Sequence, residues 1–192
     1  MEEPVVTDAI CVLSESQGSN VSGVLNFHQK QLSWVHTLET DSFQTEGARS
    51  TRSSSLQDPD YFVTITGDLA GLSPGLHGFH IHLRGDLTQG CMSTGPHFDV
   101  GRGSWHGARL DVVRHVGDLG NVEADSRGEV FFTIKDRLVS LNGPNSIVGR
   151  SAIIHALEDD LGRGGSPESR MTGGSGRIVA CGVIGVAHPK NE

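Results

Sequence analysis

The sequence has no hydrophobic run long enough to cross a membrane, and it has little positive charge. No apolar stretch approaches the ~20 residues that a transmembrane helix needs. The 15 Lys and Arg residues are outnumbered by 23 Asp and Glu residues, which gives a formal net charge of −8. An overall field of this sign disfavours binding to nucleic acid or to an anionic lipid surface. We therefore expect no nucleic acid and no membrane among its partners.

The N-terminus lacks the features of a secretory signal. Such a signal begins with positive charge followed by an apolar block, whereas Glu2, Glu3 and Asp8 stand in this region. We therefore expect a cytoplasmic protein.

Cysteine is scarce: the chain has only Cys11, Cys91 and Cys181. An odd number in a cytoplasmic protein favours free thiols. One disulfide with one free thiol is the alternative, and the sequence alone does not choose among the three pairings.

Aromatic residues make up 5% of the chain, whereas glycine occurs 26 times. The apolar segments are short, often alternate with polar residues and are separated by Gly, Ser, Asn and Asp, which favours an all-β sandwich or barrel. With 192 residues, one domain is expected. The expected strands are 9–15, 21–30, 61–72, 75–83, 129–141, 146–157 and 177–187.

Three segments of this domain do not look like strands. Residues 31–58 are polar and rich in Ser, Thr and Glu, so we expect a mobile insertion there, with a short strand near LSWVHTL. Residues 84–124 and 158–176 are predicted to be long loops. A loop of ~40 residues in a compact domain is unusual unless it is functional or cross-linked.

The segment GFHIHL carries two histidines, His80 and His82. Side chains alternate faces along a strand, so these imidazoles share one face, about 7 Å apart at ~3.4 Å per residue. That spacing allows both rings to bind one metal ion. A half-exposed strand face that carries two histidines by chance is the competing interpretation.

The first long loop adds a second set of metal-ligand residues. His97, His106, His115 and Asp118 follow one another at intervals of nine, nine and three residues. Three imidazoles and one carboxylate fit a closed tetrahedral zinc site, and such a site would help to order the loop. His155 ends an apolar strand, where a lone histidine is more often a satisfied core residue, but the other candidate ligands favour a ligand role for it. Several neutral imidazoles suit copper.

Several motifs resemble the copper/zinc superoxide dismutase family over nearly the whole chain outside residues 31–58. They are GLHGFHIH, GPHF, HVGDLGNV, DDLGRGG and ACGVIGVA. The resemblance implies an eight-stranded antiparallel Greek-key sandwich or flattened barrel whose two long loops form the metal site. It implies a superoxide dismutase that uses copper and zinc and takes the small anion superoxide as substrate.

The resemblance also assigns roles to individual residues. It implies copper ligands His80, His82, His97 and His155, and zinc ligands His97, His106, His115 and Asp118. His97 would bridge the metals and carry a proton in catalysis. Asp159 would orient one ligand of each metal, His77 would be structural, and Cys91 and Cys181 would form a disulfide.

The chain departs from the family at three positions. An arginine is expected beside the copper three residues before Cys181, where Ile178 stands; Arg177 lies one residue earlier. A shift of one residue on a strand moves a side chain to the other face, so the register of Arg177 as a catalytic residue is in doubt. Met171 stands where a lysine is often found. Arg84 replaces an aromatic residue of the family's dimer interface, while Gly85, Ile147 and Val186 keep other parts of it, so a homodimer is open but in doubt.

We therefore expect a superoxide dismutase with a reduced rate, loaded with metal by a copper chaperone. The alternative is a non-enzymatic relative on the same fold, which binds copper, delivers it or docks a partner. A third interpretation is a β-sandwich protein that binds a structural zinc ion and no copper.

Overall fold

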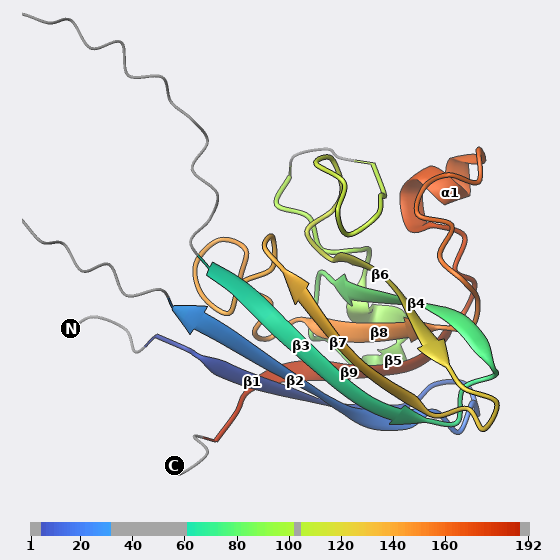
Figure 1. The fold of residues 1–192 in the computed structure, drawn as a ribbon, viewed down its shortest axis with the longest axis horizontal. Helices are drawn as coiled ribbons and strands as arrows, with labels where there is room; N and C mark the ends of the chain where they lie inside the picture. Colours follow the sequence, from blue (N-terminus) through green and yellow to red (C-terminus); the bar gives the residue numbers. More distant parts are fainter. Residues whose placement is uncertain (1–4, 32–60, 102–104, 189–192) are drawn as a thin grey trace, which may run out of the picture.

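The computed structural model describes residues 5–31, 61–101 and 105–188. Their eight long strands form one antiparallel sheet that curls into a nearly closed barrel, in the order β6-β4-β8-β9-β1-β2-β3-β7 (Figure 1). The strands are β1 Asp8–Glu15, β2 Ser22–Gln31, β3 Tyr61–Ala70, β4 Gly75–His82, β6 Asp118–Ala124, β7 Val130–Asp136, β8 Ser151–His155 and β9 Ile178–Val186. The short elements β5 Thr88–Cys91, η1 Met92–Thr94 and α1 Pro167–Thr172 lie in the long loops.

The interior of the barrel is built from alternating residues of each strand. In β1, for example, Ala9, Cys11 and Leu13 are buried, whereas Val12 is exposed. Leu25 and Phe27 of the neighbouring strand β2 lie in the same core. This period of two is the pattern that predicted the strands, and the all-β, Greek-key class expected from the sequence is confirmed.

The structure corrects several predicted boundaries. Residues 118–124, expected in a loop, form β6. Their alternation is hidden because Gly120 has a positive φ of 84° and a bulge shifts the register between β4 and β6. Strand β7 ends at Asp136 because its carboxylate accepts hydrogen bonds from the backbone of Leu138 and Val139 and turns the chain. The short helix α1 was not predicted, and the proposed insertion at 31–58 lies, apart from Gln31, outside the described residues.

A buried ion pair fastens the first long loop to the barrel. Arg114 is 5% exposed and Asp136 is 2% exposed, and Arg114 Nη2 donates to Asp136. Arg114 Nη1 also donates to the carbonyls of His115, Val116 and Asp118, at 3.1, 3.1 and 2.9 Å. One guanidinium thus connects the end of β7 to the backbone from His115 to Asp118, the segment that carries two candidate zinc ligands.

Replacing Asp136 with asparagine is expected to lower the free energy of unfolding by about 3–5 kcal/mol, because the Arg114 charge would stay buried without its counterion. Urea denaturation measures this. Glu129→Gln is the matched control: Glu129 pairs with Arg127 at 2.6 Å on the surface, and its loss should cost no more than about 1 kcal/mol. Equal losses in both variants would contradict the role of the buried pair.

Candidate metal centre

Strand β4 presents His80 and His82 on the outside of the barrel, beneath the loops. Phe79 and Ile81 point into the core, and the two histidines alternate with them. The histidines are nevertheless 0% and 5% exposed. The interpretation of this segment as a half-exposed strand face is therefore wrong, because the loops cover these rings.

Backbone pairing carries His97 to the same place. Phe98 N donates to Ile81 O and Leu83 N donates to Pro96 O, both at 2.8 Å, so that His97 lies across from His82. Gly117 packs closely against this segment, where an added Cβ would lie 2.1 Å from Ile81 O. Main-chain hydrogen bonds, and not a metal alone, therefore order this part of the loop.

Hydrogen bonds fix the protonated ring nitrogen of four histidines. His80 Nε2 donates to Asp159 Oδ2 at 2.9 Å, and His106 Nε2 donates to Asp159 Oδ1 at 2.7 Å. His155 Nδ1 donates to Gly176 O at 2.9 Å. His82 Nδ1 lies 3.0 Å from the hydroxyl of Thr94, which already donates to Cys91 O and so must accept from the imidazole.

The opposite nitrogens of these four rings are buried and have no hydrogen-bond partner. They are His80 Nδ1, His82 Nε2, His106 Nδ1 and His155 Nε2. A buried polar atom without a partner is costly, and four ring nitrogens held inward by the hydrogen bond on the other side of each ring match what a metal cation requires. The residues present thus fit metal ions.

Two overlapping groups of ligand atoms result, and within each the atoms lie no more than 4.8 Å apart. The first is His80, His82, His97 and His155; the second is His97, His106, His115 and Asp118. His97 belongs to both. Its Nδ1 lies 2.8 Å from Asp118 Oδ1, which leaves Nε2 for the first group.

Asp118 is the centre of the second group. Besides His97, the Nδ1 atoms of His106 and His115 lie 3.0 and 3.1 Å from its carboxylate oxygens. The His106 contact has the distance of an ion pair but not the alignment of a hydrogen bond, since its Nδ1 counts among the unpartnered atoms. Ligand atoms around a tetrahedral ion at ~2.0 Å would be about 3.3 Å apart, so the group is close to that arrangement.

The histidines that belong to only one of the two groups have pKa values shifted in opposite directions in the metal-free protein. Burial lowers the pKa of His80, and it lowers the pKa values of His82 to about 3 and His155 to about 4. Burial also opposes protonation of His106, but the neighbouring carboxylates of Asp118 and Asp159 outweigh it and raise the pKa to about 9. The first group therefore offers neutral imidazoles, whereas the second gathers positive charge around carboxylates.

These shifts predict how the stability of the metal-free protein depends on pH. The unfolded chain takes up protons near the ordinary histidine pKa of about 6.5, whereas His82 and His155 stay neutral in the fold, so stability falls as the pH drops below that value. The stabilisation from protonated His106 is full below the unfolded pKa and is lost as the pH rises through about 9. Chelator-treated protein should show its highest urea midpoint near neutral pH; a higher midpoint at acidic pH would contradict this.

The backbone around Asp159 is itself held in place. Asn121 exchanges two hydrogen bonds with the main chain of Asp159, at 2.8 and 2.9 Å. Gly173, with φ of 72°, passes so close that an added Cβ would lie 1.8 Å from Asp159 Oδ1. The sequence analysis did not identify the supporting roles of Thr94, Asn121 and Gly173. Their only signal in the sequence is that they lie within or beside the segments that carry the family motifs.

The remaining predicted groups near the site occupy defined places. His77 is buried, and its ring nitrogens lie 2.9 Å from His155 O and 2.8 Å from Ser73 O, as a structural residue would. Cys91 and Cys181 form a disulfide that ties the first loop to β9, and Cys11 is a buried free thiol. In the chain-entropy model, closing this loop stabilises the fold by about 4–5 kcal/mol.

Ile178, and not Arg177, is the strand partner of His155. Paired residues of antiparallel strands have their side chains on the same face, so Ile178 shares the face of the candidate copper ligand. It packs against the cluster of Cys91, Ile153 and Cys181. Arg177 is exposed and pairs with no carboxylate that the structure describes.

Three further residues of the second long loop, Met171, Arg163 and Arg170, lie at the surface. Met171 is 62% exposed. Arg163 lies 3.8 Å from Asp111, and Arg170 is exposed near the C-terminal end of α1.

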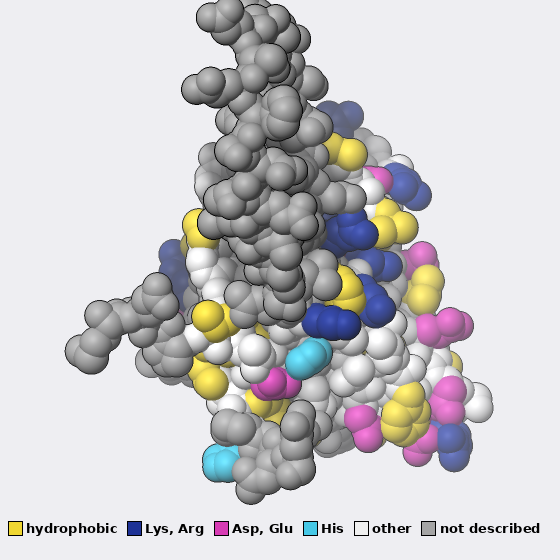
Figure 2. All heavy atoms as spheres, turned by 60° about the vertical axis from the view of Figure 1, so that its left-hand side comes forward, with side chains coloured by type: hydrophobic (Ala, Val, Ile, Leu, Met, Phe, Trp, Pro, Cys, Tyr) yellow, Lys and Arg dark blue, Asp and Glu magenta, His cyan; other side chains and the backbone are white. Residues whose placement is uncertain are grey.

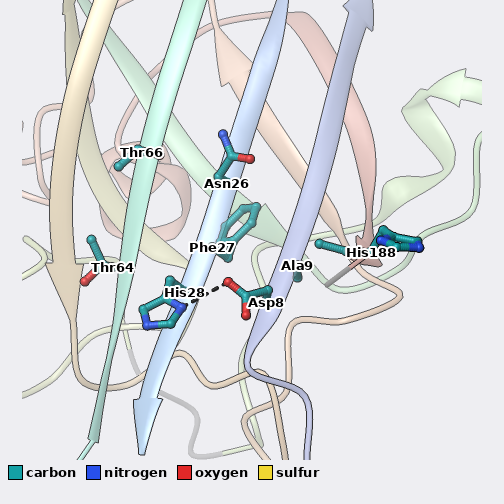
Figure 3. Close-up of a pocket in the computed structure, with 9 residues that line it drawn as sticks. Asp8, Ala9, Asn26, Phe27, His28, Thr64, Thr66 and His188 are labelled. Carbon is teal, nitrogen blue, oxygen red and sulfur yellow. Dashed lines mark hydrogen bonds and ion pairs between the residues drawn. The ribbon is translucent and has the colours of Figure 1, made fainter. Parts of the chain in front are cut away.

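A separate hollow of about 320 Å³ lies on the outside of β1, β2 and β3 (Figure 3). His28 Nδ1 lies 3.0 Å from Asp8 Oδ1 there, and His188 is also on its wall. None of these residues belongs to the groups of candidate ligands found among the described residues.

The sequence profile of the copper/zinc superoxide dismutase family matches residues 46–184. The chain belongs to the copper/zinc superoxide dismutase family. It is also similar to the crystal structure of the clock protein EA4, with 37% sequence identity and a TM-score of 0.76 over 97% of this chain and 99% of that chain. The family and the two histidine-rich groups agree with a copper- and zinc-binding protein.

No helix within the described parts of the chain is both long and apolar enough to cross a membrane.

Proposed function

We propose that this protein binds copper through His80, His82, His97 and His155, binds zinc through His97, His106, His115 and Asp118, and disproportionates superoxide. The observation that carries the proposal is the set of buried lone pairs on His80, His82 and His155. Each is fixed by a hydrogen bond on the other side of its ring, so the three nitrogens are prepared for a cation.

Bound copper supplies the one-electron chemistry by which two superoxide anions and two protons become one oxygen and one hydrogen peroxide. The protein's own residues hold and orient the reactants. His97 Nδ1 faces Asp118 in the zinc group, so its Nε2 is the atom that can take up a proton and return it to the peroxide. Asp159 keeps the imidazoles of His80 and His106 in the tautomers that each metal needs.

The lack of positive charge beside the candidate copper ligands favours a slow enzyme. Superoxide is an anion and the chain carries a net charge of −8, so fast capture needs local positive charge at the copper. Ile178 supplies none on the face of His155. We propose a turnover below that of family members with an arginine in this position, with Arg177 contributing only from a distance.

Metal analysis combined with a direct superoxide assay tests the proposal. Purified protein should hold one copper and one zinc, show visible copper absorption, and dismutate superoxide in pulse radiolysis. His155→Ala should lose copper and activity but keep zinc. His28→Ala removes an exposed histidine outside both groups and should change neither. Wild-type protein that binds no copper after loading would refute the proposal.

A non-enzymatic copper-binding relative is the second candidate. Ile178 in the arginine position favours it, and so does the likeness to a protein known as a clock protein. This candidate predicts full metal content without dismutation, so the same two measurements separate it from the enzyme. We also propose that the protein is cytoplasmic and that a copper chaperone supplies its copper.

We propose a monomer. Arg84 is exposed at the position of the expected interface aromatic residue, and burying an unpaired guanidinium is costly. Ile147, expected in the same interface, is 0% exposed and lies in the core of this chain. Val186 remains available at 60% exposure. A sedimentation coefficient of a dimer at micromolar concentration would overturn this proposal.

A further inference from the structure

A strip of basic side chains crosses the ends of three elements of this acidic protein. Lys30 on β2 pairs in the sheet with Phe62 on β3, and Lys135 on β7 stacks its ammonium 4.6 Å above the Phe62 ring. Arg109 of the first long loop donates to Lys135 O. Arg137 follows two residues after Lys135 and is exposed. Figure 2 shows Lys and Arg side chains gathered on one face of the molecule, with hydrophobic side chains among them.

Three members of the strip keep their charge. Lys30, Arg109 and Lys135 form no ion pair with any carboxylate in the described residues. Asp136, which lies beside Lys135 in sequence, is buried against Arg114. The strip is therefore a local positive field on a protein whose net charge is −8.

Next to the strip, the first long loop exposes four large apolar side chains, which we term the apolar tip. They are Trp105 at 62%, Leu110 at 81%, Val112 at 98% and Val113 at 63% exposure.

The loop that carries the tip is compact. Asp111 N donates to Ala108 O at 2.8 Å, and Gly107 packs so closely that an added Cβ would lie 2.9 Å from Val113 O. The hydrogen bond from Arg109 to Lys135 O fixes the tip beside the basic strip. Protruding apolar side chains are therefore presented on a fixed support with the basic strip on one side; the exposed Asp111 between Leu110 and Val112 lies 3.8 Å from Arg163.

We propose that this face binds anionic lipid surfaces, with the apolar tip inserted among the lipid chains and the basic strip against the headgroups. Exposed aliphatic and aromatic side chains enter the boundary between headgroups and chains, and nearby Lys and Arg attract anionic lipids. The overall negative charge of the protein disfavours binding to a membrane only through its long-range electric field. At physiological ionic strength this field is screened beyond about 8 Å, so the local strip governs the contact.

The shape and size of the tip favour a lipid over a second copy of the chain. A side chain that is 98% exposed, such as Val112, has no neighbours beside it and would need a matching cavity in a protein partner. Stable dimers bury about 800 Å² on each partner, which four side chains of one loop do not reach. A bilayer accommodates a protruding tip without a preformed cavity.

Vesicle sedimentation tests the proposal with the metal-loaded protein. Vesicles of phosphatidylcholine and phosphatidylserine should bind it, and vesicles of phosphatidylcholine alone should bind it at least tenfold more weakly. In a Trp34→Phe background, the emission of Trp105 should shift to shorter wavelength on binding. Val112→Asp should abolish both signals, and Lys135→Glu should weaken binding by at least about fivefold.

Two control variants change similar side chains elsewhere. Val12→Asp alters a residue of 62% exposure on the barrel, and Arg127→Glu alters an exposed cation at the β6–β7 turn; both should bind vesicles as the wild type does. Melting temperature and zinc content of each variant establish that the loop is intact. The proposal is overturned if no vesicle binds, if the controls lose binding as much as the tip variants do, or if Val112→Asp instead abolishes self-association seen by sedimentation.

Discussion

Replacing Asp159 with asparagine is expected to weaken the binding of copper and of zinc together, each by about 10- to 100-fold. The wild-type carboxylate accepts Nε2–H of His80 through one oxygen and Nε2–H of His106 through the other. An asparagine side chain offers one acceptor oxygen, and its amide faces the second ring with a donor. That ring must then change tautomer, which places a proton on the Nδ1 atom that faces its metal. The other ring donates to a neutral amide oxygen, which is a weaker acceptor than a carboxylate, so its Nδ1 becomes a less basic ligand as well.

Titrations with a competing chelator, carried out separately for the two metals, measure the effect. Glu158→Gln is the control because it removes the neighbouring exposed carboxylate and leaves both hydrogen bonds in place. If the asparagine variant loses affinity for only one metal, Asp159 does not couple the two sites. If the control loses as much as the variant, the general charge of the loop is responsible and not the hydrogen bonds.

The ligands themselves could be predicted because their spacing has a local cause. His80 and His82 share a strand face by simple alternation, and the structure places them together. His97, His106, His115 and Asp118 are close in sequence. The family motifs supplied their pairing with His155, which alternation alone could not.

The residues that support these ligands could not be predicted, because their roles depend on contacts distant in sequence. Thr94 fixes the tautomer of His82 only because η1 folds against β4. Asn121 lies in β6, a strand concealed by a bulge and by Gly120. Its contact with Asp159 joins residues 38 positions apart.

Replacing Ile178 with arginine is expected to raise the rate of superoxide dismutation at low ionic strength by about tenfold or more. The pairing of Ile178 with His155 places the new guanidinium on the face of the copper group, whereas Arg177 lies one residue out of register. Ile178 is only partly buried, so the long side chain can reach solvent while its stem packs on the disulfide.

Pulse radiolysis of fully metal-loaded protein measures the change, and its dependence on salt identifies the cause. An electrostatic gain falls steeply as the ionic strength rises, whereas a gain from altered packing does not. Ile178→Met, which changes shape without adding charge, should leave the rate where it is. The double variant Arg177→Ile with Ile178→Arg keeps the net charge of the wild type. If it is as fast as the single variant, the position of one guanidinium limits this site and not the charge of the whole protein; if neither variant gains activity while copper is fully bound, the non-enzymatic relative is the better account of the protein.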